Sequence, residues 1–331
     1  MKIKDIVGID ISKLTFDAAI HSNQIASQFE NSKKGFNKLV DWTFKNSESS
    51  KESVLFVLEH TGLYSHSLSV YLTSNNIPFL LVPGLEIKKS MGMIRGKNDQ
   101  ADAKMIAKYG YRLRDEIKPT VLSCEQEQSI KRLLSLRERL VKQRAGFKAS
   151  FKEQKRVLIK KENETLFSTQ QKMINYLSKQ IKEVEKQMNV IIKNNRSMLE
   201  NYKLMTSIKG IGPQTALFMI AYTANFKRFD NHRKFASYCG IAPFQNQSGT
   251  SIRGKTKVSH LANKKIKSLL DLCAKTSIQH NTEMRIYYER RIAEGKNKMS
   301  TINIIRNKLV ARMFAVVERG ENYVDTMKYA A

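Results

Sequence analysis

Ile6-Val7-Gly8-Ile9-Asp10 and Val54-Leu55-Phe56-Val57-Leu58-Glu59 are two apolar runs of the same design near the start of the chain. Both are rich in branched residues and too short for core helices, so they predict buried strands of a mostly parallel sheet. Each run ends in a carboxylate, Asp10 or Glu59. Because open α/β sheets place their sites at the carboxyl ends of such strands, these two runs predict an acidic site there.

The segments around these runs alternate between strand and helix patterns up to about residue 115. The predicted order is strand 6–11, strand 15–20, strand 25–29, helix 35–44, strand 54–59, helix 63–74 and strand 77–82. Three antiparallel strands followed by two strand–helix crossovers is the order of a ribonuclease-H-like α/β fold. In that fold the first and fourth strands are neighbours, so we expect Asp10 and Glu59 to lie side by side.

Two further acids, Asp99 and Asp102, stand three residues apart at the start of an apparent helix, and this spacing places them on one helical face. Carboxylate oxygens are the ligands that Mg²⁺ prefers, and bound Mg²⁺ can bridge substrate phosphates. Asp10, Glu59, Asp99 and Asp102 therefore predict a magnesium site that acts on nucleic acid. Each acid alone has an ordinary alternative role as a helix cap or strand-end charge, so the set carries the prediction.

The charge balance favours a polyanionic partner. The 331 residues include 58 Lys and Arg against 30 Asp and Glu, for a formal net charge of +28, and nucleic acid is the usual partner of such a surplus. Three scattered cysteines predict neither a disulfide framework nor a zinc site, which favours a reducing cytosol. With no signal-peptide pattern and no long apolar run, we expect a cytoplasmic, nucleoid-associated prokaryotic protein with no membrane contact.

Three parts are expected along the chain: residues 1–122, a helical arm at 123–200 and a mostly helical part at 201–331. In the arm, Pro and Gly nearly vanish and apolar residues recur at alternating steps of three and four. A turn is predicted at 160–164, between two long helices. An antiparallel hairpin that packs on itself and a dimerising coiled coil fit this pattern equally well. The seam residues are Ile174, Leu177, Ile181, Val184, Met188 and Ile191 in the second helix, and Leu133, Leu136, Leu140 and Phe147 in the first.

The third part opens with Ser207-Ile208-Lys209-Gly210-Ile211-Gly212-Pro213, the pattern of a helix-hairpin-helix. Its glycines would bring backbone N–H groups close to a phosphate at a helix N-terminus, and Pro213 suits the first helical turn. Lys209, Gly210 and Gly212 are therefore predicted to contact nucleic acid. A plain Gly-rich connection between helices is the alternative.

A Gly/Ser-rich break follows at 247–257, Gln-Ser-Gly-Thr-Ser-Ile-Arg-Gly-Lys-Thr-Lys. Its glycines, hydroxyl residues and three cations indicate a mobile loop that binds phosphate, in which Arg253, Lys255 and Lys257 contact nucleic acid. An ordinary surface turn has the same composition.

Several motifs, in order, resemble those of the Piv-type invertase and insertion-sequence transposase family, the bridge-RNA-guided recombinases with a RuvC-like DEDD domain. The acidic motifs are Gly8-Ile9-Asp10-Ile11-Ser12-Lys13, Leu58-Glu59-His60-Thr61-Gly62-Leu63-Tyr64 and Lys97-Asn98-Asp99-Gln100-Ala101-Asp102-Ala103. Ile208 to Pro213, Tyr238 to Pro243 and Gln247-Ser248-Gly249 resemble the family's C-terminal transposase domain.

This resemblance implies a function. Family members cut and rejoin DNA through a serine that forms a covalent phosphoserine, beside magnesium held by the RuvC-like acids. Carried over, Asp10, Glu59, Asp99 and Asp102 hold Mg²⁺ and Ser248 is the nucleophile, with Ser251 as the alternative. The implied partners are donor and target double-stranded DNA, a structured noncoding guide RNA and further copies of the chain, as a dimer or tetramer.

A serine hydroxyl is a weak nucleophile until it is activated, and no histidine lies near Ser248 in the sequence. Activation by metal across domains or subunits is therefore the working hypothesis. Two other readings compete with it. A RuvC-like structure-specific endonuclease would use the same acids with water, and a non-catalytic nucleic-acid-binding protein would use them only structurally.

Overall fold

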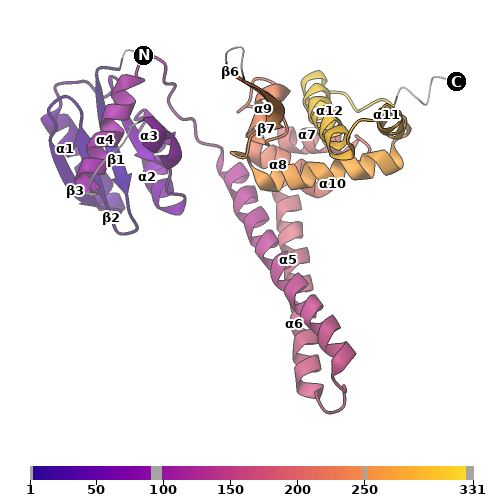
Figure 1. Ribbon diagram of the computed structural model, residues 1–331. Helices are drawn as coiled ribbons and strands as arrows, with labels where there is room; N and C mark the ends of the chain where they lie inside the picture. The colour runs from indigo at the N-terminus through magenta and orange to yellow at the C-terminus, as the bar shows by residue number, and fades with distance from the viewer. Residues whose placement is uncertain (1–2, 91–98, 249–251, 326–331) are drawn as a thin grey trace. The chain divides into compact units, whose positions relative to one another are not determined.

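The structure is a computed structural model that describes residues 3–90, 99–248 and 252–325 (Figure 1). The chain divides into two compact units, residues 1–122 and 123–331. Each unit is built around hydrophobic clusters of its own, and each is described by itself below.

The first unit contains a five-stranded sheet with the order β3-β2-β1-β4-β5. The β1–β2 and β2–β3 pairs are antiparallel, whereas the β1–β4 and β4–β5 pairs are parallel. This mixed sheet confirms the predicted strand order and is consistent with a ribonuclease-H-like domain. The strands are β1 (Asp5–Ile11), β2 (Thr15–Ile20), β3 (Ala26–Glu30), β4 (Val54–Glu59) and β5 (Phe79–Val82).

Helices cover both faces of this sheet. Helices α1 and α2 contribute Leu39 and Leu68 to a cluster that also contains Val7 and Ile9 of β1. Helix α4 contributes Ile106 to a second cluster, with Ile6, Leu55 and Val57. Because side chains alternate along a strand, one apolar run such as β1 supplies both clusters. The helices of this unit are α1 (Lys33–Asn46), α2 (Leu63–Ser74), α3 (Gly84–Ser90) and α4 (Asp99–Arg112).

The second unit begins with a long antiparallel hairpin of α5 (Glu125–Val157) and α6 (Glu164–Lys193), which is visible as the projecting pair of helices in Figure 1. The predicted turn lies between them. The α6 seam is buried as predicted from Ile174 to Met188, but the prediction was wrong at its end, where Ile192 is buried and Ile191 is only half-buried. On α5, Leu136 of the predicted seam is exposed.

The base of this hairpin is part of the core of the second unit. Ile130 of α5 and Met188 of α6 belong to one cluster with Met219, Leu270 and Leu309 from the later helices. The boundary expected at residue 200 therefore falls inside a compact unit. The later elements are α7 (Arg196–Thr206), α8 (Pro213–Thr223), α9 (His232–Tyr238), β6 (Pro243–Ser248), β7 (Ile252–Val258), α10 (Lys264–His280), α11 (Thr282–Ala293) and α12 (Lys298–Arg319).

The segment predicted as a mobile loop is a β-hairpin in its described part. Strands β6 and β7 pair antiparallel, from Pro243 opposite Val258 to Ser248 opposite Ile252. In β7, Ile252, Thr256 and Val258 alternate with three cations, which is a strand pattern, but glycine and hydroxyl residues dominate the composition of 247–257 and favoured a loop. Within the described ranges, no helix combines the length and the apolar character that crossing a membrane requires.

Candidate metal centre and nucleic-acid interface

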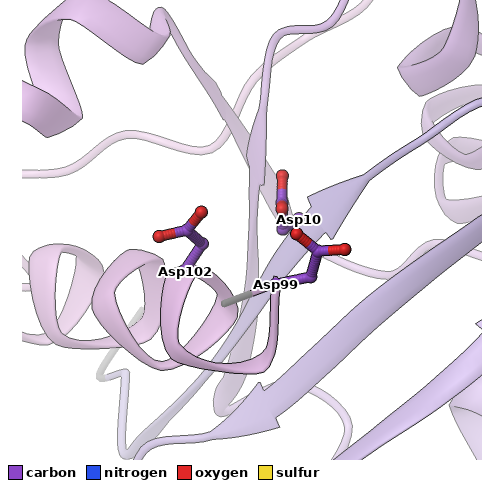
Figure 2. A group of neighbouring side chains, drawn as sticks. All are labelled: Asp10, Asp99 and Asp102. Carbon is purple, nitrogen blue, oxygen red and sulfur yellow. The ribbon is translucent and has the colours of Figure 1, made fainter. Parts of the chain in front are cut away.

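Three carboxylates converge at the carboxyl end of β1. Asp10 is the penultimate residue of that strand, Asp99 is the first residue of α4, and Asp102 lies in the first turn of the same helix. One oxygen from each lies within 4.8 Å of the others. Figure 2 shows Asp10 on its strand facing the two acids at the start of the helix. The first turn of a helix favours negative charge, because its free N–H groups carry partial positive charge.

Close packing of α4 on β1 brings the three acids together. A Cβ atom at Gly8 would lie 2.2 Å from the backbone nitrogen of Ala107, and one at Gly110 would lie 2.7 Å from the Val57 side chain. Only glycine at these two contact points allows the helix to lie this close to the strand. Gly8 is two residues before Asp10, so the contact also fixes the helix beside the strand end.

The fourth predicted acid, Glu59, lies on the neighbouring strand. Strands β1 and β4 are parallel with Ile9 opposite Leu58, so Asp10 and Glu59 follow at the same level. The Glu59 carboxylate lies beside Gly84, where a Cβ atom would come within 2.0 Å of its Oε1. The structure thus gathers Asp10, Asp99 and Asp102 into one group and places Glu59 next to it on the sheet.

The electrostatic environment of Asp10 is that of an unneutralised acidic site. Burial, followed by the charges of Glu59, Asp102, Asp99 and Asp17, raises the pKa of Asp10 from 3.8 to about 6. Within the described part of the chain, no lysine or arginine forms an ion pair with any of the four predicted ligands. Nearby negative charge favours the protonated acid, so a bound cation would relieve the repulsion.

Asp17 is a fifth acid that sequence reasoning missed. It lies directly opposite Asp10 in the β1–β2 ladder, is buried, and accepts a hydrogen bond of 3.1 Å from Gln28 Nε2. Like charges directly opposite one another destabilise a strand pair, which strengthens the case for a cation here. The available signal was an aspartate between Phe16 and Ala18 in an otherwise apolar strand.

The donor set fits a hard divalent cation. The three gathered ligands offer only carboxylate oxygen, without the histidine or cysteine that zinc and softer metals prefer. Asp10 is half-buried, Asp102 is half-buried and Asp99 is exposed, so one side of the group is open to a substrate. The geometry therefore supports use of a divalent metal at a site accessible to phosphate.

The predicted nucleophile lies in the other unit. Ser248 ends β6, where its backbone pairs with Ile252, and Ser251 lies outside the described residues. Of the predicted cations nearby, Arg253, Lys255 and Lys257 all lie on β7, and Lys257 is exposed.

The predicted helix-hairpin-helix turn connects α7 to α8. Gly212 is the N-cap of α8, with open space beside it, and Pro213 begins the helix. Gly210 has φ of +98°, and a Cβ atom there would lie 2.0 Å from Ser277 Oγ, so this face of the turn packs on α10. Lys209 pairs with Asp325 at 3.0 Å. The charge of Asp325 therefore offsets that of Lys209 and weakens its predicted contact with a phosphate.

Two segments of the chain match sequence families of transposases. Residues 7–160 match the family described as "Transposase", the DEDD transposase domain of the IS110 type, and residues 202–289 match the "Transposase IS116/IS110/IS902 family". The pilin gene-inverting protein of Moraxella bovis is 26% identical over 326 residues, which cover 97% of this chain and 98% of the relative. The transposase for insertion sequence element IS1111A of Coxiella burnetii is 23% identical over 354 residues, 98% of this chain and 92% of the relative.

The acids of the converging group fall inside the first matched segment, and the α7–α8 turn and the β6–β7 hairpin fall inside the second. The two matches occur in chain order and belong to transposases of one kind. This chain is a DNA transposase or recombinase of the IS110/IS116 transposase family.

Proposed function

We propose that this transposase cuts and rejoins double-stranded DNA through the hydroxyl of Ser248, while Asp10, Glu59, Asp99 and Asp102 hold Mg²⁺. The observation that carries the proposal is the convergence of Asp10, Asp99 and Asp102, whose oxygens come within 4.8 Å from two elements far apart in sequence. The raised pKa of Asp10 supports it, because a divalent cation would offset both of its causes, burial first and then the charges of the neighbouring acids.

In this mechanism Ser248 Oγ forms a bond to phosphorus while the bond from phosphorus to one sugar oxygen breaks. The departing sugar oxygen takes up a proton, and the serine hydroxyl loses one. A hydroxyl of a second DNA end then displaces Oγ, which rejoins DNA and restores the serine. Magnesium at the acids would supply positive charge to the phosphate oxygens.

The partners proposed for this reaction are a structured noncoding guide RNA and further copies of the chain, as a dimer or tetramer. The net charge of +28 supports binding to polyanions, of which DNA and RNA are both examples. With a guide RNA, base pairing would select the sites, and the protein would mainly contact backbone and shape. Recovery of a discrete RNA with the purified full-length protein tests this part.

The proposal is tested by trapping the covalent protein–DNA adduct under denaturing conditions. The substrate is DNA that carries both ends of the element together with its noncoding segment. We expect an adduct with wild-type protein and Mg²⁺, none with Ser248→Ala, and retention with the matched control Ser251→Ala. An adduct lost only in Ser251→Ala would move the role to that serine. Cleavage that persists in both variants would favour a nuclease that uses water.

DNA inversion is a second candidate outcome for the same chemistry. It is supported by the near full-length similarity to proteins named as pilin gene-inverting in Moraxella bovis and Moraxella lacunata. A plasmid with the two recombination sites in inverted orientation distinguishes the outcomes. Sequenced junctions would show either a flipped segment or an excised and inserted one.

A further inference from the structure

A cationic and aromatic patch lies beside the base of the β6–β7 hairpin, away from the groups assigned above. It is formed by Lys131 of α5, Tyr222 of α8, Arg228 and Phe229 after α8, and Tyr238, the last residue of α9. We call these five residues the neck patch. All of them belong to the second unit.

Aromatic rings hold both cations in place. Lys131 Nζ lies 5.7 Å from the centre of the Tyr222 ring, and the side chain is half-buried. The Arg228 guanidinium lies 5.4 Å from the ring centres of both Phe229 and Tyr238. Such contacts stabilise a cation and orient it without neutralising its charge.

The two cations lack a carboxylate of their own. In the described ranges, neither Lys131 nor Arg228 forms an ion pair. Burial and then the charge of Arg228 lower the pKa of Lys131, and the nearby charge of Glu127 opposes them with a smaller effect. The surrounding acids have other partners. Glu127 accepts a hydrogen bond of 3.1 Å from the Cys124 backbone N–H, Glu138 pairs with Lys142 and Lys265, and Asp230 pairs with Lys234.

Two neighbouring cations without a salt bridge favour an anion, and the charge of Glu127 offsets only part of theirs. An anion between them would remove their mutual repulsion and accept hydrogen bonds from both the ammonium and the guanidinium. The Tyr222 ring is already stacked on Phe218 and the Tyr238 ring packs on Phe235, so the patch offers positive charge to a nucleic-acid backbone and no free stacking surface.

The patch is tied directly to the hairpin that carries Ser248. The Asn263 backbone N–H donates to the Tyr238 carbonyl at 2.9 Å, and Asn263 Nδ2 donates to the Tyr238 hydroxyl at 3.1 Å. Tyr238 precedes β6 and Asn263 follows β7, so this contact closes the base of the hairpin. A strand bound at the neck patch would therefore pass next to the hairpin.

We propose that Lys131 and Arg228 bind a backbone phosphodiester of the nucleic acid that the β6–β7 hairpin engages. The proposal deepens the function proposed above by naming a phosphate-binding site for the same substrate. Because it concerns binding, it can fail while the chemistry assigned to Ser248 stands, and the reverse is also true.

The test compares full-length wild-type protein with Lys131→Gln/Arg228→Gln in fluorescence anisotropy. The probes are a 30-base-pair DNA duplex and a 30-nucleotide RNA hairpin, titrated over a series of NaCl concentrations. Each phosphate contact contributes roughly 0.9 to the slope of log K against log salt on duplex DNA. We expect the double variant to bind about tenfold more weakly, with a slope smaller by about 1.

The matched control is Lys296→Gln/Lys298→Gln, which removes two exposed lysines from the same unit and lowers the net charge equally. It should leave the slope unchanged. Arg228→Lys combined with wild-type Lys131 should keep the wild-type slope, because it keeps the charge. A change seen only with DNA, or only with RNA, would identify the source of the phosphate.

An unchanged slope in Lys131→Gln/Arg228→Gln, with the wild-type melting temperature, would overturn the neck-patch proposal. A slope that falls equally in the lysine control would overturn it too. Ser248→Ala should bind both probes as wild type does. Failure of the proposed chemistry would therefore appear in the covalent-adduct assay and leave these binding curves unaffected.

Discussion

The ionised carboxylate of Asp10 lowers the stability of the folded, metal-free protein, because burial and the neighbouring acids disfavour its charge. A bound cation would offset this loss. The Asp10 pKa of about 6 lies above the ordinary value of 3.8, so the folded, metal-free protein binds this proton more tightly than the unfolded chain does. Stability contributed by this group is therefore present at low pH, falls as pH rises from about 4 to about 6, and stays lost above that range.

Asp10→Asn should therefore stabilise the metal-free first unit at pH 7. We expect an increase of about 1 kcal/mol in its free energy of unfolding, after allowance for solvent screening of a half-exposed group. Trp42, the sole tryptophan, lies in α1 and packs on Phe29, so its fluorescence in urea reports on this unit. The gain should vanish near pH 4, and added Mg²⁺ should no longer stabilise the variant. A variant less stable than wild type at pH 7 would contradict this account of the site.

Gly8→Ala should loosen the contact that brings the acids together. The new methyl group would meet the backbone of α4 at Ala107 and Ala103, neither of which can move without shifting the helix. Overpacking of this kind costs roughly 1–3 kcal/mol, and we expect a loss in this range by Trp42 fluorescence together with weaker Mg²⁺ binding.

Gly146→Ala is the matched control for that substitution. Gly146 lies within α5, is exposed, and has no atom within 4 Å of an added Cβ. The same change there should stabilise the second unit by about 0.5–1 kcal/mol through helix propensity, as measured by its thermal unfolding. Equal effects of the two substitutions would show that the Gly8 contact is not specific.

At the scale of elements, α12 holds the segment that enters the β6–β7 hairpin. Asn303 and Asn307, one turn apart on that helix, both donate side-chain hydrogen bonds to the Ile241 carbonyl, at 2.8 Å and 3.0 Å. In the double variant Asn303→Ala/Asn307→Ala, the carbonyl of the buried residue Ile241 would lose both of its side-chain amide donors. We expect a loss of roughly 1–3 kcal/mol and faster hydrogen exchange in residues 241–248.

Glu318→Ala, an exposed change on the same helix, is the control and should alter neither measurement. Protection of residues 241–248 that is equal in the double asparagine variant and in this control would show that the hairpin does not depend on α12.

The elements of the first unit were predictable from the sequence because their apolar runs are short, branched and bounded by polar turns. Strand β4 and helix α2 begin and end at the predicted residues, and β5 is shorter at its start, beginning at Phe79. The prediction for the helical arm was less accurate at the end of its second helix. A straight helix turns every 3.6 residues, so a seam spaced at 3.5 drifts, and Ile192 replaces Ile191 in the core.

The grouping of Asp10, Asp99 and Asp102 was also predictable, from the strand end and from helical spacing. Two details of the site, the placement of the Glu59 side chain and the presence of Asp17, were not predictable, and for the same reason. The side-chain direction of Glu59 depends on the room left by Gly84, and the position of Asp17 depends on pairing register, and neither is a local property of sequence. The β6–β7 hairpin was missed because the glycine and hydroxyl residues of 247–257 suggested a loop, although Ile252, Thr256 and Val258 of β7 alternate with cations.

At the scale of the whole molecule, the two units have separate cores, and only the first contains the converging acids. A ligand stabilises the state that binds it, so Mg²⁺ should act on one unit. At about 100 times its dissociation constant, Mg²⁺ should add roughly 2.7 kcal/mol to the unfolding transition reported by Trp42. The melting of the second unit, which dominates the helical circular dichroism signal, should not move.

Two controls make this prediction specific to the acids. Asp102→Asn should reduce the shift of the Trp42 transition, and Na⁺ at matched ionic strength should not produce it, because screening alone acts on both units. A Mg²⁺ shift of equal size in both transitions would mean that the ion acts through general charge on a protein of net charge +28. A shift confined to the helical signal would place the metal outside the group of Asp10, Asp99 and Asp102, and the assignment of the site would then be wrong.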